Sequence, residues 1–99
     1  MKIPKRFKLL ASTTNVVFDD RRLDDLNAYG YHEPTTNVIT LSRIDGIKDI
    51  CEDLILDTFY HERTHAILYA MGKRELNKDE EFVDLFSKLL RQADETAEY

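Results

Sequence analysis

The chain lacks the cysteine pairs that stabilise small secreted proteins and the long apolar segments that cross membranes. Its 99 residues include one cysteine and no tryptophan, with three glycines and two prolines. A single cysteine excludes an internal disulfide, and no apolar run approaches the roughly 18 residues that a membrane span requires. The amino terminus also lacks the apolar stretch of a signal peptide. We therefore expect a cytoplasmic protein with no membrane partner, held together by one hydrophobic core.

The net charge of -5 at pH 7 is unevenly distributed. Four basic residues lie within the first eight positions: Lys2, Lys5, Arg6 and Lys8. Such a group is common on a solvated strand end, so we do not expect nucleic acid as a partner. The acidic stretch from Glu75 onward is most simply a solvated helix surface. Length and composition predict a single domain over residues 1–99 and leave the oligomeric state open.

The first half of the chain reads as short strands. Four runs are strand candidates: Phe7 to Ala11, Val16 to Phe18, Tyr29 to Glu33 and Val38 to Ser42. The turn-like residues Ser12 to Asn15 and Pro34 to Asn37 separate them into two pairs. Gly30 and Pro34 indicate that the third strand is bulged or lies at a sheet edge. The charged segment from Asp19 to Leu26 is expected as a loop or a short helix.

The second half changes to helical spacing. From Asp45 or Gly46 to Met71, side chains recur three and four residues apart, which predicts a long helix that ends before Gly72. One expected inward stripe is Ile47, Ile50, Cys51, Leu54, Thr58, His61, His65 and Leu68, and a second is Ile55, Phe59, Glu62, Ala66 and Tyr69. A helix apolar over so much of its circumference is typical of a buried position.

A second helix is expected from Asn77 or Asp79 to about Ala93. Its predicted core face is Phe82, Phe86, Leu89 and Ala93, flanked by Val83, Leu85 and Leu90. The loop from Lys73 to Leu76 would connect the two helices. The predicted fold class is thus α+β, with a small amino-terminal antiparallel or mixed sheet followed by a buried helix and a carboxy-terminal helix.

The long helix carries the sequence His61-Glu62-Arg63-Thr64-His65, or H-E-x-x-H. On a helix, residues four apart share a face, so both imidazoles can reach one metal ion. Glu62 is rotated by about 100° from His61 and could take a proton from a metal-activated water. Burial of these three side chains is costly unless each is paired, and a metal pairs them. The spacing therefore predicts a metal site with His61 and His65 as ligands.

A third ligand has to come from outside the motif. An extended H-E-x-x-H-x-x-G-x-x-H pattern is absent, and Cys51 lies about 15 Å before His61 along the helix, too far to reach the same ion. Downstream, Glu80 and Asp84 lie four apart on one helix face, so Glu80 could ligate the metal while Asp84 accepts a hydrogen bond from the ring N–H of a ligand histidine. Glu81, and behind it Glu75 and Asp79, remain alternatives. A capping box from Asn77 to Glu80 is the structural explanation of the same acids.

H-E-x-x-H followed by a helical E-x-x-x-D resembles gluzincin metallopeptidases, the thermolysin-like class. The small size is similar to minigluzincins, and residues 60–72 with 79–90 resemble compact metallopeptidase-like proteins of phages and prophages. The resemblance implies zinc held by His61, His65 and Glu80, with Glu62 as general base and Asp84 as partner of a histidine. It also implies that an edge strand, at Tyr31 to Pro34 or Val38 to Ser42, binds an extended peptide. Arg63 departs from the apolar residue common there, which predicts partial solvation or a facing acid on that side.

The expected activity is zinc-dependent hydrolysis of a peptide bond in a peptide or protein substrate. A donor for the tetrahedral oxyanion would also be needed, and the sequence offers five candidates: Tyr29, Tyr31, His32, Tyr60 and Tyr69. Ninety-nine residues leave little material to wall a deep cleft, so a shallow groove is expected. The alternative is a metal-binding scaffold of peptidase type that binds a partner protein without cleaving it.

Overall fold

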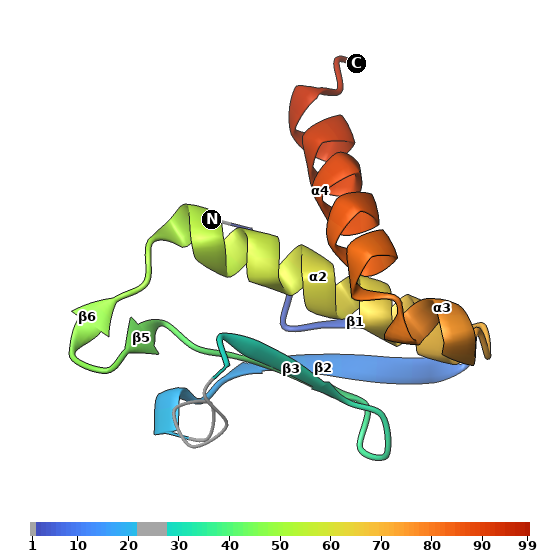
Figure 1. Cartoon of the computed structure of the whole chain (residues 1–99), viewed down its shortest axis with the longest axis horizontal. Coiled ribbons are helices and arrows are strands. Elements are labelled where there is room, and N and C mark those ends of the chain that lie inside the picture. Colours follow the sequence, from blue (N-terminus) through green and yellow to red (C-terminus); the bar gives the residue numbers. More distant parts are fainter. Residues whose placement is uncertain (1, 22–27) are drawn as a thin grey trace.

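The computed structural model describes residues 2–21 and 28–99, and in them a sheet precedes the helices (Figure 1). The elements in chain order are β1 (Arg6–Leu9), β2 (Ser12–Phe18), β3 (Gly30–Glu33), β4 (Val38–Leu41), β5 (Ile44–Asp45), β6 (Lys48–Asp49), α2 (Glu52–Ala70), α3 (Arg74–Lys78) and α4 (Glu80–Thr96). The predicted α+β class is confirmed. The segment expected as a loop or short helix after Asp19 falls mostly outside the described residues.

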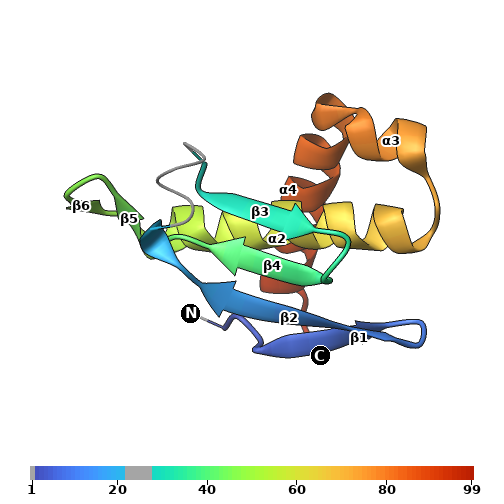
Figure 2. The same cartoon turned by 90° about the horizontal axis from the view of Figure 1, so that it is seen from below.

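The main sheet is mixed, with the strand order β1-β2-β4-β3. β2 and β4 are parallel, while β1 and β3 are antiparallel to their neighbours. α2 lies across one face of this sheet, and α4 crosses α2 and rises away from it (Figures 1 and 2). The core between sheet and helix consists of Val16, Ile39, Leu41, Phe59 and Ala66.

The first hairpin turns earlier than predicted. β1 and β2 meet across Leu10 and Ala11, with Leu10 at a φ of 56°, so the residues expected as a turn lie inside β2. Thr14 explains the difference: it is fully buried, and its hydroxyl donates to Asn37 Oδ1 at 3.1 Å. A threonine whose hydroxyl is satisfied across the sheet behaves as a β-branched strand residue rather than as a turn former.

The second hairpin follows the prediction closely. β3 and β4 pair around a turn at residues 34–37, and Asn37 takes a left-handed φ of 57°. β3 lies at the sheet edge, as Gly30 and Pro34 indicated, whereas β4 lies between β2 and β3. Of the two segments expected to bind an extended peptide, β3 is the one that lies at an edge of the described sheet.

The long helix begins later than predicted, at Glu52. Residues 44–49 instead form the small hairpin β5–β6, with Gly46 at a φ of 64° in its turn. Ile47, expected on the inward stripe, is wholly exposed there. Gly72 follows the helix end with a φ of 71°, as predicted.

The buried side of α2 follows the second of the two predicted stripes, except that Tyr69 is exposed and Leu68, from the first stripe, is buried. Ile55, Phe59, Glu62 and Ala66 are buried, whereas His61 and His65 lie beside them, half-buried. This corrects the expectation that the histidine stripe points into the core. The rotation leaves both imidazoles at the margin of the core, where a ligand can reach them.

The predicted core face of α4 is wrong. Val83 and Ser87 are buried against α2, while Phe86 and Leu89 are exposed. Phe86 instead stacks on Phe82 of the same helix, with ring centroids 5.5 Å apart. The reason is that α4 crosses the single helix α2 and does not lie along the sheet. A narrow row of side chains on α4 is therefore enough to make the contact with α2.

Arg91 fixes the far part of α4 to the start of α2. Its guanidinium donates to the main-chain oxygen of Asp53 at 2.9 Å and to Asp57 Oδ1 at 2.8 Å, and it pairs also with the Asp53 and Glu95 carboxylates.

Within residues 2–21 and 28–99, the helices are too short or too polar to cross a bilayer.

Candidate metal centre

The two motif histidines share one face of α2, as their spacing predicted. Their ring centroids are 5.0 Å apart, and 24% of the His61 side chain and 17% of the His65 side chain are exposed. One turn of helix places the second ring beside the first without any help from other elements. A third ligand, however, has to be brought in from a separate element.

α3 turns the chain back toward the histidines after α2 ends. This short helix overlaps the expected loop, Lys73 to Leu76, and extends to Lys78, and Asp79 alone separates it from α4. Asp79 caps α4 by accepting from the main-chain N–H of Phe82 at 3.1 Å. The predicted capping box from Asn77 is therefore not formed. With the cap on Asp79, Glu80 becomes the first residue of α4, and its side chain is free to extend toward α2.

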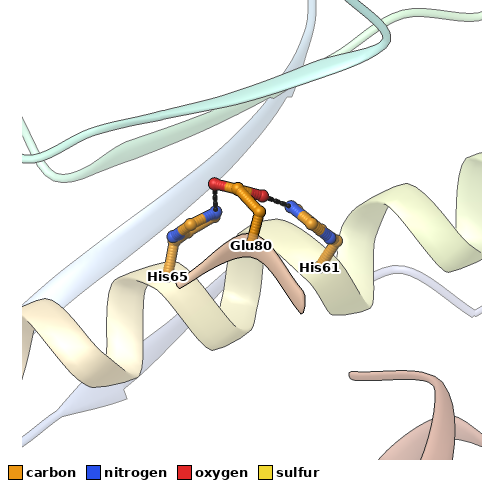
Figure 3. A group of neighbouring side chains, drawn as sticks. All are labelled: His61, His65 and Glu80. Carbon is orange, nitrogen blue, oxygen red and sulfur yellow. Dashed lines mark ion pairs between the residues drawn. The ribbon is translucent and has the colours of Figure 1, made fainter. Parts of the chain in front are cut away.

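Glu80 bridges the two imidazoles (Figure 3). Its Oε2 lies 3.2 Å from His61 Nε2, and its Oε1 lies 3.3 Å from His65 Nε2. Among the described residues, these three side chains form the group whose ligand atoms all lie within 4.8 Å of one another. Neither Glu81 nor Cys51 belongs to it.

Two of these separations are close to those around a tetrahedral ion. Nitrogen and oxygen ligands lie about 2.0–2.2 Å from zinc, so two of them at a tetrahedral angle are about 3.3–3.5 Å apart. The histidine–carboxylate distances are 3.2 and 3.3 Å, each to a different oxygen of Glu80. Two imidazoles and one carboxylate also form a known ligand set of catalytic zinc, which leaves a fourth position open.

Asn77 contacts the candidate site, which the sequence did not reveal. Its Oδ1 lies 2.5 Å from His65 Nδ1, so the ring has an acceptor on each side, the other being the Glu80 carboxylate. A neutral imidazole carries one proton and can satisfy one acceptor. A proton on Nδ1 and a metal on Nε2 satisfy both nitrogens, which is the usual arrangement of a ligand histidine. Asn77 reaches His65 through α3, an element that was not predicted.

Asp84 lies near His61 but does not hold it closely. Its Oδ1 is 3.8 Å from His61 Nδ1, beyond the range of a hydrogen bond, and its Oδ2 accepts from Lys88 at 3.0 Å. Asp84 thus lies on the predicted side of His61 but too far away for a direct hydrogen bond.

Arg63 lies on the opposite side of α2, 3.8 Å from Asp94 and over the Tyr60 ring. The prediction of a facing acid is confirmed.

Glu62 lies beside the histidines, with 9% of its surface exposed. Burial raises the pKa of its carboxyl, and the charges of His65 and His61 oppose that rise. The main chain of His32, in β3, also favours the charged form of this carboxyl. Glu62 therefore lies beside both the edge strand and the candidate metal ligands.

Two open hollows flank this group along the β3 edge. One, of about 430 Å³, is lined by Tyr31, Tyr69, His65 and Glu80 among others. The other, of about 290 Å³, is lined by Tyr29, Asp84 and Lys88 among others. Gly30, His61 and Glu62 line both hollows, so the candidate site lies where the two meet. The expected shallow groove corresponds to this pair.

The candidate oxyanion donors differ in their hydrogen-bond partners and in whether they line the larger hollow. The Tyr60 hydroxyl donates to Asp94 at 2.7 Å, and the Tyr29 hydroxyl donates to Asp45 at 2.8 Å. Tyr31 and Tyr69 are exposed and line the larger hollow. His32 lines it too, but its Nε2 is buried and has no hydrogen-bond partner among residues 2–21 and 28–99, and burial lowers the pKa of this histidine. Tyr31 and Tyr69 thus remain as the exposed candidates beside the larger hollow.

Comparison with protein-family models finds no match. Comparisons with curated proteins and with solved structures find no significant match either.

Proposed function

We propose that this chain is a zinc-dependent hydrolase of peptide bonds. The observation that carries the proposal is the convergence of His61, His65 and Glu80 at distances suited to one tetrahedral ion, with Glu62 adjacent. His61, His65 and Glu80 would hold the zinc, and Asn77 would keep the proton of His65 on Nδ1. The bound metal would supply Lewis-acid activation of a water and of the scissile carbonyl.

The chain's own groups would transfer the proton, align the substrate and stabilise the oxyanion. Glu62 would accept the proton of the attacking water and deliver it to the leaving amine, a role that suits a carboxyl whose pKa is raised by burial. The edge strand β3 would align an extended substrate between the two hollows. Tyr31 or Tyr69 would donate a hydrogen bond to the developing oxyanion.

A metal-binding scaffold that captures a partner without cleaving it is the second candidate. The exposure of the site favours this candidate. The Glu80 side chain is 67% exposed, and the described residues form no second subdomain over the two hollows. Water exclusion, which strengthens electrostatic stabilisation of a transition state, would then depend on the bound partner alone.

Cleavage of a peptide library by the zinc-loaded protein separates the two candidates. We expect cleavage that a chelator abolishes and that added zinc restores. Glu62→Gln should retain zinc and lose cleavage, because an amide cannot accept the proton. A protein that binds zinc and peptides but cleaves none of them would support the scaffold, and a protein that does not bind zinc would contradict both.

A further inference from the structure

Gly30 lies where the edge strand comes closest to the metal-site helix. A β-carbon built on it would lie 2.4 Å from Thr58 Cγ2, 3.2 Å from Glu62 Cγ and 3.3 Å from Leu41 Cδ2. The first distance is far shorter than any real contact, and the second involves the candidate general base itself. Gly30 is thus the residue whose missing side chain allows β3 to approach α2 beside Glu62.

Thr58 cannot easily make room for a side chain. It is β-branched, so few rotamers are open to it in a helix. Its hydroxyl donates to the main-chain oxygen of Leu54 at 2.8 Å, and a rotation that moved the methyl group away would break this bond. A side chain at position 30 would therefore push the strand and the helix apart.

The same approach serves the Glu62 carboxylate. His32 follows Gly30 by two residues on β3, and its main chain favours the charged form of that carboxylate. If β3 moved outward, this part of the main chain would move with it. The alignment of the substrate-binding edge with the general base would change, while His61, His65 and Glu80, which belong to α2 and α4, would keep their places.

We propose that Gly30 is a positioning residue: its lack of a side chain sets the distance between the β3 edge and Glu62 on which hydrolysis depends. The inference rests on the proposed hydrolytic function. Restoring an ordinary contact of 3.4 Å from 2.4 Å requires a shift of about 1 Å. A displacement of that size in a catalytic arrangement costs about 100-fold in rate.

The test compares wild type with Gly30→Ala, Thr58→Ser and the double variant. Serine lacks Cγ2, the atom that the new β-carbon meets first, but keeps the hydroxyl that bonds to Leu54. We expect Gly30→Ala to lower kcat by about 100-fold with zinc affinity unchanged. Thr58→Ser alone should keep kcat near wild type, and the double variant should recover most of the loss. A merely structural role would alter the melting temperature without this change in kcat at temperatures where every variant is folded.

Two results would overturn the inference. One is a folded Gly30→Ala protein with wild-type kcat, because Thr58 would then have absorbed the side chain. The other is a folded double variant that remains as slow as Gly30→Ala.

A second readout does not require turnover. In wild type and in the double variant, Glu62→Gln should shift the ¹⁵N–¹H resonance of the His32 amide, whereas in Gly30→Ala it should have little effect. If the wild type hydrolyses no peptide but the resonances behave in this way, the proposed function fails and the positioning by Gly30 is supported. An equal shift in the Gly30→Ala background would contradict it.

Discussion

Zinc should stabilise this protein strongly, and Glu80 should account for most of the effect. An ion that binds only the folded chain adds about 2.7 kcal/mol to the free energy of unfolding at a free concentration of 100 times its Kd. For a domain of this size, each kcal/mol raises the melting temperature by about 4–8 °C. We therefore expect zinc to raise the melting temperature by roughly 10–20 °C under those conditions.

The Glu80→Gln variant should lose this shift. Even partners of metal ligands cost about 10–100-fold in affinity when they are removed, so loss of a ligand should cost at least about 100-fold. At the same zinc concentration, the stabilisation then falls to about 0.4 kcal/mol, or roughly 2–3 °C. Differential scanning fluorimetry with and without zinc measures both values.

Glu81→Gln is the matched control. It removes the same charge from the same first turn of α4, so both variants lose a similar interaction with the helix dipole. Glu81 does not belong to the three-residue group, and its variant should keep the full zinc shift. An equal loss in both variants, or a full shift in Glu80→Gln, would refute Glu80 as the third ligand.

Three further predictions test the surroundings of the site. Asn77→Ala should weaken zinc binding by about 10–100-fold in a chelator competition, because His65 loses the acceptor that holds its Nδ1 proton. Arg91→Met should lower the free energy of unfolding in urea by about 2 kcal/mol, because charge-assisted bonds to Asp53 and Asp57 are lost while those acids stay partly solvated. Burial lowers the pKa of His32, so the folded chain binds its proton less readily than the unfolded chain, and stability should fall as the pH drops below the ordinary value of 6.5. In metal-free protein, His32→Gln should show a smaller acid-induced drop in melting temperature.

Periodicity predicted the elements of this fold better than their boundaries and faces. The β3–β4 hairpin was predicted because Pro34 and Asn37 are turn residues between two good strand formers. The start of α2 was misplaced because Ile47 continues the helical spacing by coincidence, while Gly46 actually turns a hairpin. The buried face of α4 was misassigned since hydrophobicity favoured its phenylalanines, whereas the crossing angle with α2 selected Val83 and Ser87.

The candidate site was predictable as far as it depends on one helix. His61, Glu62 and His65 lie within five residues, and helical geometry alone places them together. Glu80 was favoured because it lies four residues before Asp84 on one helix face, while Glu81, Glu75 and Asp79 remained alternatives. What separates it from Glu81 is the cap on Asp79, which sets the first turn of α4.

The contacts that complete the site come from parts of the chain that no local pattern links. Asn77 reaches His65 through α3, and the main chain of His32 reaches Glu62 across the close approach at Gly30. Each contact depends on how two elements pack, and in a small domain such packing is held by few interactions. Zinc would join α2 to the α3–α4 segment at the site, while Arg91 joins the same helices at their other ends. A metal site that forms only in the folded chain adds its binding free energy to the free energy of folding. The zinc affinity should therefore report how well these two helices are held together.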